Sequence, residues 1–390
     1  MADKGGANSP LKLPILDLSK ANNPIQKQRL LEQLHDALFN VGFLYIKNHG
    51  VDLETISNLV SLLPALFGQP AEAKAALSKL NSPHFLGYSG YAEEITLGEK
   101  DLREQFDLAT ELPVVWDPTP TGYSEKGNST SGRDFSHLYW RLRGPNQWPS
   151  EEHVPGFRRA FTEYHDALQA LSYRFVHLVE AAFGIPVGTF DAFFRPTPVH
   201  DVVPTFVPAQ HRVKLVKYPP IPSSGDGVRG QGVGAHKDSS GWLTFLYQVG
   251  QEEGLEVLCA NGEWIAAPPV DGTLVVNFGN AFEAATQGAV KATVHRVLAP
   301  KSKASPRYSI PFFQGLPLDL TISEIQSYIP ESVRKLRRDS ANPNLQENVS
   351  SFQDPRWDNL GESQLRKWIR SHENVARKWY GSRVTAFYLQ

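Results

Sequence analysis

The chain has 390 residues, which allows one large elaborated domain or two ordinary ones. Its 39 lysines and arginines nearly balance its 41 aspartates and glutamates, so the net charge of −2 offers no basic excess for nucleic acid or an anionic membrane. The single cysteine, Cys259, excludes an internal disulfide and a thiolate metal cluster, and it favours a reducing, cytoplasmic compartment. We expect any bound metal to be held by imidazole and carboxylate.

The front of the chain predicts a disordered tail followed by alternating strands and helices. Residues 1–12 are polar and lack the apolar core of a signal peptide, and no apolar run in the sequence approaches the ~20 residues of a membrane span. The apolar periodicity then predicts strand 13–18, helix 25–39, strand 41–50, helices 53–67 and 71–80, and strand 105–110.

The second half predicts a long helix, a set of short strands and a helical end. Apolar residues recur every three to four positions over 154–183, which is typical of a helix that buries one face. Strands are predicted at 213–218, 243–248, 255–258, 274–278, 291–298 and 308–313, and helices at 322–336 and 362–380. Closely spaced short strands favour a barrel or sandwich, so we expect one domain whose helices pack on a double-sheet core.

The β-rich centre carries a candidate metal site. His236 and Asp238 are two residues apart, so in a strand both point to one face, and the next histidine follows at His295. Two imidazoles and one carboxylate form the facial triad of non-haem iron(II) oxygenases, although zinc also accepts these ligands. A His-x-Asp pair alone is more typical of a solvated turn beside a core histidine than of a metal site.

A second motif strengthens the metal interpretation. Arg307 and Ser309 lie on a predicted strand after His295, where both side chains face one side. A guanidinium is suited to a two-oxygen clamp on a carboxylate, and a hydroxyl adds one hydrogen bond. Tyr218, on the strand before the first motif, offers a phenolic donor to the same carboxylate.

In this order, the motifs resemble the isopenicillin N synthase-like branch of the Fe(II)/2-oxoglutarate oxygenases, especially its microbial and fungal members. The resemblance covers residues 13–315. Its central motifs are Tyr218-Pro-Pro, the His-x-Asp block, Gly254-Leu-Glu-Val, Gly262-Glu-Trp-Ile, Asn277-Phe-Gly, His295-Arg-Val and Arg307-x-Ser. Its front motifs are Leu13-Pro-Ile-Leu-Asp, the block from Gly42 to Gly50, and Gly144-Pro-Asn-Gln-Trp-Pro.

The resemblance implies an α+β fold with a double-stranded β-helix, or jelly-roll, core flanked by helices in a single domain. The corresponding division is a front region 13–150, a long helix and connection 151–199 and a jelly roll 200–315. The helical pattern of residues 316–390 predicts a C-terminal cap that serves as a lid, a dimer contact or plain packing.

The resemblance also implies cofactors and site residues. Iron(II) would be ligated by His236, Asp238 and His295, with O₂ and 2-oxoglutarate as cosubstrates. Arg307 and Ser309 would bind the distal carboxylate of 2-oxoglutarate, with help from Tyr218. Many plant members have asparagine where this chain has Val216, so this position would give the cosubstrate fewer hydrogen bonds.

The substrate side is less well defined by the sequence. Glu94 and Thr96 resemble a Glu-x-Thr of the bacterial ethylene-forming enzyme that contacts a guanidino amino acid, which predicts a cationic or polar substrate group there. The alternative is an exposed loop with ordinary ion pairs. Trp242, Phe282 and Phe313 are candidate substrate contacts, and core packing is the alternative for each.

Several functions remain open at this point. The first is a 2-oxoglutarate-dependent hydroxylase, desaturase or cyclase acting on a small organic substrate, without nucleic acid or membrane as partner. The second is an ethylene-forming enzyme that fragments 2-oxoglutarate. The others are an oxidase of the isopenicillin N synthase type, which uses no 2-oxoglutarate, and a non-catalytic binding module. The oligomeric state is not predicted.

Overall fold

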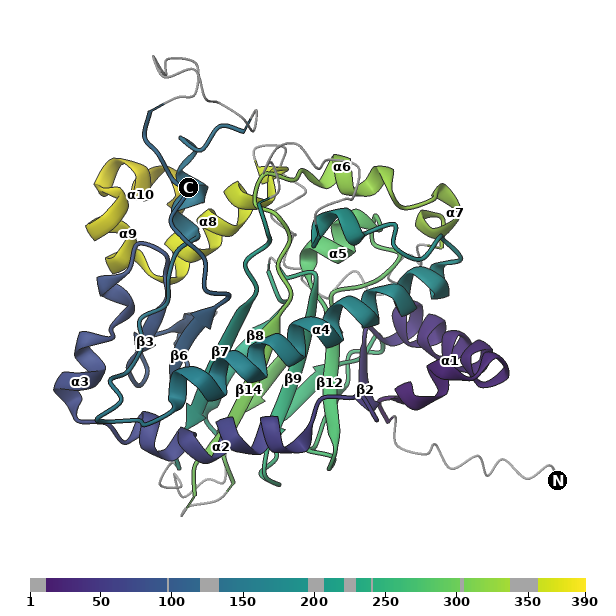
Figure 1. Cartoon of the computed structure of the whole chain (residues 1–390), viewed down its shortest axis with the longest axis horizontal. Helices are drawn as coiled ribbons and strands as arrows, with labels where there is room; N and C mark the ends of the chain where they lie inside the picture. The colour runs from purple at the N-terminus through teal and green to yellow at the C-terminus, as the bar shows by residue number, and fades with distance from the viewer. Residues whose placement is uncertain are drawn as a thin grey trace.

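The structure is a computed structural model (Figure 1), and it describes residues 12–96, 98–119, 133–195, 207–220, 229–239, 241–301, 305–336 and 357–390. The predicted disordered tail lies outside the described residues except for Lys12.

Two β-sheets form the centre of the molecule. The larger has eight strands in the order β1-β2-β12-β9-β14-β7-β6-β3, and the smaller has four in the order β11-β10-β13-β8. The large sheet contains β1 (Ile15–Asp17), β2 (Phe43–Lys47), β12 (Thr273–Phe278), β9 (Leu243–Val249), β14 (Arg307–Phe313), β7 (Arg212–Tyr218), β6 (Glu104–Ala109) and β3 (Gly87–Ser89). The small sheet contains β11 (Trp264–Ala266), β10 (Leu255–Leu258), β13 (His295–Leu298) and β8 (Gln231–His236). All neighbours pair antiparallel except β1 and β2.

The two sheets pack face to face through an apolar cluster. Val216 and Val275 of the large sheet meet Val233, Val257 and Val297 of the small one. This arrangement confirms the predicted jelly-roll core, in which alternate residues of each strand point between the sheets.

Helices cover the opposite face of the large sheet. The long helix α4 (Phe157–Phe183) crosses it, with α1 (Pro24–Asp36) and α2 (Leu53–Phe67) beside α4 (Figure 1). On β14, Ile310 and Phe312 point toward this helical layer and are fully buried. The residues that alternate with them along the strand point to the inside of the jelly roll.

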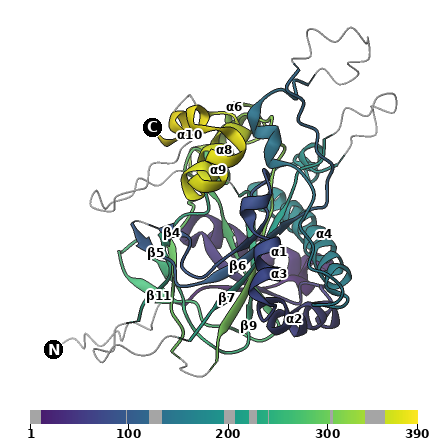
Figure 2. The ribbon, with the colours of Figure 1, turned by 90° about the vertical axis from the view of Figure 1, so that its left-hand side faces the viewer.

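The C-terminal end differs from the single predicted helix over 362–380. This end of the chain forms three helices, α8 (Leu360–Ser371), α9 (Glu373–Tyr380) and α10 (Ser382–Leu389). They lie against the N-terminal part of the chain (Figure 2). The break occurs at His372, which has φ −141° and ψ 64° and is held by a tertiary contact to Glu94. Periodicity does not reveal a helix break of this kind, because the apolar pattern continues across it.

Other differences have local causes. The predicted helix 322–336 is divided into α6 (Ile322–Ser327) and α7 (Glu331–Arg334) at Pro330, since proline removes a backbone donor. The predicted helix 71–80 ends early, as α3 (Ala71–Ala76). The sequence pattern does not predict strand β8, because two glycines weaken it. Within the described residues, no helix is both long and apolar enough to span a bilayer.

Candidate active site

The candidate metal ligands lie together where the end of strand β8 meets the start of strand β13. His236 ends β8, His295 begins β13, and the two are paired across the small sheet. Asp238 lies in the turn after β8, so it follows the strand instead of lying within it as predicted. One ligand atom of each residue lies within 4.8 Å of the other two. Asp238 Oδ1 is 3.8 Å from His236 Nε2 and 3.7 Å from His295 Nε2.

Hydrogen bonds orient all of these ligand atoms toward one point. Nδ1 of His236 lies 2.8 Å from the Gly234 carbonyl, and Nδ1 of His295 lies 3.0 Å from the Thr293 carbonyl. Donation from Nδ1 leaves Nε2 as the acceptor in each neutral ring, which is the form that binds a metal. Thr244 and Asn277 donate to Asp238 Oδ2 at 2.7 and 2.6 Å, so Oδ1 stays directed at the histidines.

The protonation states suit a metal site. Burial, together with the adjacent His295, lowers the pKa of His236 to about 3 and keeps the imidazole neutral. Burial raises the pKa of Asp238, but the two imidazoles and the hydrogen bonds from Asn277 and Thr244 outweigh it and hold the pKa below its ordinary value. A neutral imidazole at His236, a second imidazole at His295 and an ionised carboxylate fit iron(II) by donor chemistry.

A buried cation faces the same space from the large sheet. Arg307 and Tyr218 are register partners on β14 and β7, and both side chains point between the sheets. The Arg307 guanidinium donates to Gln248 Oε1 at 2.8 Å and to the Glu252 carbonyl at 3.2 Å. Its Nη1 is buried and has no hydrogen-bond partner among the described residues. An unsatisfied guanidinium nitrogen beside the metal site fits an anionic ligand such as a carboxylate.

One cavity of about 370 Å³ connects these groups. Ser309 and Phe313 border it from β14, next to the metal ligands, since alternate residues of this strand face inward. Val216, the register partner of Ser309, offers only an apolar surface there. Thr96 and Glu94 border the cavity from the front of the chain.

Two predicted substrate residues do not border this cavity. Trp242 and Phe282 are 0% and 1% exposed and belong to the core beneath the helical layer, with ring centroids 4.4 Å apart. Trp242 also packs edge-on against Phe190. The prediction is corrected because both aromatic rings point to the helix-covered side of the large sheet, where they pack as core.

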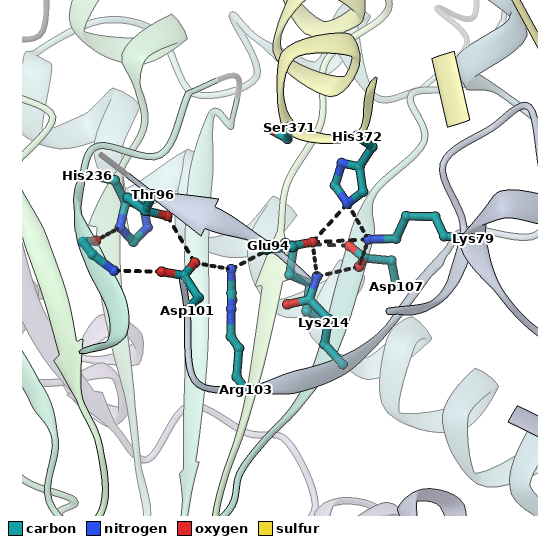
Figure 3. Close-up of polar contacts among 12 residues, drawn as sticks. Lys79, Glu94, Thr96, Asp101, Arg103, Asp107, Lys214, His236, Ser371 and His372 are labelled. Carbon is teal, nitrogen blue, oxygen red and sulfur yellow. Dashed lines mark hydrogen bonds and ion pairs between the residues drawn. The ribbon is translucent and has the colours of Figure 1, made fainter. Parts of the chain in front are cut away.

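Glu94 lies in an irregular segment between exposed residues, but its carboxylate is largely buried and bound by ion pairs within the protein (Figure 3). Its carboxylate accepts from Arg103 at 2.7 Å and Gln105 at 2.8 Å, and it lies 3.2 Å from Lys79 Nζ and 2.9 Å from His372 Nε2. Burial raises the pKa of Glu94, but three surrounding cations hold it well below its ordinary value. The charge of Glu94 is thus already compensated within the protein.

The same polar network extends to the metal site. Asp101 Oδ1 accepts from the Gly234 amide at 3.1 Å, and its Oδ2 accepts from Thr96 at 2.9 Å and from Arg103 at 3.2 Å (Figure 3). Any β-carbon on Gly234 would lie 2.7 Å from the Thr96 methyl, so glycine is needed for this close approach. Asp101 therefore fixes the strand that ends in His236.

The sequence interpretation missed the residues that close the cavity from the C-terminal helices. Lys367, Trp368, Ser371 and His372 border it from α8 and the following break, and Lys214 borders it from β7. The helical spacing of Lys367, Ser371 and Trp368 gave no functional signal, because their partners lie more than two hundred residues away in the sequence.

Comparison with known proteins identifies the family. Residues 13–151 match the profile described as the N-terminal part of non-haem dioxygenase in morphine synthesis, and residues 209–315 match the 2OG-Fe(II) oxygenase superfamily. A 2-oxoglutarate-dependent dioxygenase, frbJ, of Dothideomycetidae sp. (strain 11243) is 40% identical over 366 residues, which is 93% of this chain and 90% of that protein. The chain belongs to the Fe(II)- and 2-oxoglutarate-dependent dioxygenases.

Further relatives agree with this assignment. A 2-oxoglutarate-dependent dioxygenase of Gibberella zeae is 31% identical over 341 residues, covering 85% of this chain and 81% of that one. The crystal structure of a full-length Neurospora crassa protein in complex with alpha-KG has a TM-score of 0.63 at 24% identity, covering 86% of this chain and 93% of that one, and it supports the fold. This dioxygenase therefore uses iron(II), 2-oxoglutarate and O₂, as the family resemblance predicted.

Proposed function

We propose that His236, Asp238 and His295 hold the iron and that Arg307, Ser309 and Tyr218 hold the distal carboxylate of 2-oxoglutarate. The observation that carries the proposal is the buried, unpartnered Nη1 of Arg307 in the cavity that the three ligands border. Iron with 2-oxoglutarate and O₂ supplies the oxidising chemistry, with succinate and CO₂ as products, and the protein orients the reactants and excludes water.

The substrate in this proposal is a small organic molecule that is hydroxylated, desaturated or cyclised. The cavity of about 370 Å³ has the size of a small-molecule site. It is enclosed by the two sheets on one side and by α8 on the other, which suits neither a nucleic acid nor a membrane surface.

The experiment that tests the proposal is incubation of iron-loaded protein with 2-oxoglutarate under air, with succinate, ethylene and O₂ uptake measured together. The control is His236→Ala, which removes one ligand. We expect 2-oxoglutarate-dependent succinate formation by the wild type and only background formation by the variant. Succinate at background in both proteins would overturn the proposal.

The same measurement separates the alternative functions. Ethylene in the headspace, in proportion to 2-oxoglutarate consumed, would instead support the ethylene-forming reaction. O₂ uptake that is independent of 2-oxoglutarate would support an oxidase. We expect no ethylene, because the compensated charge of Glu94 leaves no free carboxylate there for the guanidino group on which that resemblance rested. We expect O₂ uptake to require 2-oxoglutarate, because the chain belongs to the 2-oxoglutarate-dependent dioxygenases.

A further inference from the structure

One lysine on the cavity wall, Lys367, forms no salt bridge with a carboxylate among the described residues. Lys367 lies on α8 and borders both the main cavity and a smaller adjoining one of about 50 Å³. Its side chain is half-buried, and within the described residues its Nζ has neither an ion pair nor a side-chain hydrogen bond. The nearest stabilising group is the indole of Trp368, whose centroid lies 4.4 Å from Nζ.

The charges around Lys367 are otherwise paired. Lys79 and Lys214 lie beside Asp107, at 2.8 and 3.7 Å, and Arg103 is bound by Glu94 and Asp101. These three cations and three carboxylates cancel. Lys367 therefore adds a positive charge that lies outside this balance, and Glu94, Asp107 and Asp238 act on it without forming a salt bridge.

A second cation borders the smaller cavity. Among the described residues, the Arg212 guanidinium donates to the backbone carbonyls of His84, Phe85 and Leu142, and it stacks on Trp368 with Cζ 4.4 Å from the ring centroid. The Trp368 indole thus contacts both Arg212 and Lys367, and Arg212 lies at the opposite end of β7 from Tyr218, the register partner of Arg307. Such a wall attracts an anion and repels a cationic substrate group.

We propose that the primary substrate carries a carboxylate, which Lys367 binds from α8 while the apolar part of the molecule extends along Trp368 and Phe313 toward the iron. This inference rests on the proposed function and defines its substrate class. It predicts an anionic substrate group in place of the cationic group that the resemblance at Glu94 predicted, because the Glu94 carboxylate is already bound by Arg103 and its neighbours.

Two further observations support an anion at this place. Ser239 Oγ borders both cavities beside Lys367 and, although buried, has no hydrogen-bond partner among the described residues. Burial and the charge of Lys214 outweigh the nearby carboxylates and lower the pKa of Lys367 to about 7, and a bound carboxylate would add counter-charge to the ammonium.

The test compares three probes of one skeleton: 3-phenylpropanoate, 3-phenylpropanamide and 3-phenylpropylamine. Their binding is measured by calorimetry under anaerobic conditions to the iron-loaded protein with saturating 2-oxoglutarate, which occupies Arg307. We expect the acid to bind at least about tenfold more tightly than the amide or the amine, since a charge-assisted hydrogen bond is gained only by the acid.

Variants assign the preference to the lysine. We expect Lys367→Gln to abolish the preference for the acid and Lys367→Arg to retain it. Arg370→Gln removes an exposed charge from the same helix and should leave the preference unchanged. Melting temperatures of all variants show whether each has folded.

Each result decides the inference. An acid that binds no more tightly than the amide, or a preference that survives Lys367→Gln, would overturn it. Binding of 2-oxoglutarate and succinate formation without added substrate are measured in the same proteins. If these are normal while the preference is absent, only the carboxylate inference fails; if they are absent in the wild type, the proposed function fails.

Discussion

The two sides of the cavity are built in different ways. On the iron side, the three proposed ligands and Arg307 come from strands of one jelly roll or from the residues directly after a strand, and backbone carbonyls and neighbouring side chains hold each group in place. On the opposite side, charged groups come from three distant parts of the chain, around Lys79 to Asp107, at Lys214 and on α8, and they mainly hold one another.

The difference separates the residues proposed to hold the iron and 2-oxoglutarate from those proposed to select the substrate. The iron side presents unsatisfied or directed atoms toward the cavity, namely Nη1 of Arg307 and Nε2 of the histidines. The opposite side directs most of its charges inward, into the network in Figure 3, and leaves Lys367 toward the cavity. A mutation on the first side should therefore affect cofactor binding, and a mutation within the network should affect folding.

The largest expected effect is on folding stability, from Glu94→Gln. Removing this charge leaves Lys79, Arg103 and Lys214 undercompensated in a largely buried place, so the free energy of unfolding should fall by about 3 kcal/mol. Urea denaturation measures this change. If Glu94 instead served a cationic substrate, stability would be unchanged and only substrate affinity would fall.

A matched control for this variant is Glu99→Gln. Glu99 is exposed and lies five residues after Glu94, at the start of the short strand β5 (Glu99–Lys100). The loss of its charge should change the free energy of unfolding by less than about 0.5 kcal/mol. An equal effect of both substitutions would show that the network does not stabilise the fold, and the distinction between the two sides would be lost.

The sequence predicted that the residues of the iron side converge but did not predict the arrangement of the opposite side, for a physical reason. Strand alternation brings Arg307 and Ser309 to one face by local geometry, and short motifs locate the ligands around them. The position of Lys367 depends on how α8 packs, and the role of Glu94 depends on the approach of His372 from the other end of the chain. The local periodicity of apolar residues does not reveal contacts between residues that lie far apart in the sequence.

The same reasoning explains the two aromatic errors. Trp242 is the residue directly before strand β9, and it lies close to Asp238 in the sequence. This position suggested that its side chain borders the cavity. In the fold its ring turns to the helical layer and packs against Phe282. Closeness in sequence does not determine which face of a sheet a side chain joins, because one residue of shift reverses it.

The second prediction concerns Arg307→Gln. The variant loses the charge-assisted bond to the distal carboxylate, so the Kd of 2-oxoglutarate should rise about 10- to 100-fold while iron affinity stays unchanged. Calorimetry with 2-oxoglutarate on the anaerobic iron-loaded protein measures the first affinity, and anaerobic titration of the metal-free protein with iron(II) measures the second. Ser309→Ala, which removes one hydroxyl from the same face, should raise this Kd only about threefold. Equal effects of the two substitutions would contradict the assigned roles.

The third prediction addresses the positioning of Asp238. Asn277→Ala removes a 2.6 Å hydrogen bond to Oδ2, so the affinity for iron(II) should fall about tenfold, as is typical when a ligand loses an orienting partner. Anaerobic metal titration measures this. Asn261→Ala, at an exposed turn beyond β10, serves as the control and should leave the titration unchanged. An unaltered affinity in Asn277→Ala would show that Thr244 alone fixes the carboxylate.

The smallest effect is the pH dependence of carboxylate binding. Burial, followed by the charge of Lys214, lowers the pKa of Lys367 to about 7, while Glu94, Asp107 and Asp238 act in the opposite direction. The ammonium is charged below this pKa and neutral above it. The affinity for 3-phenylpropanoate should therefore be greatest below about pH 7 and fall about fivefold between about pH 7 and about pH 8.

A charge-retaining variant isolates this titration from that of every other group. In Lys367→Arg the guanidinium stays protonated, because its pKa lies far above this range, so the affinity for the acid should be flat between about pH 7 and about pH 8. Calorimetry in buffers of different ionisation enthalpy adds an independent measure. Wild-type protein should take up a proton on binding above the pKa of Lys367, because the bound carboxylate stabilises the ammonium, and the arginine variant should take up none. Equal pH profiles in the two proteins would assign the dependence to another group and would place the carboxylate away from α8.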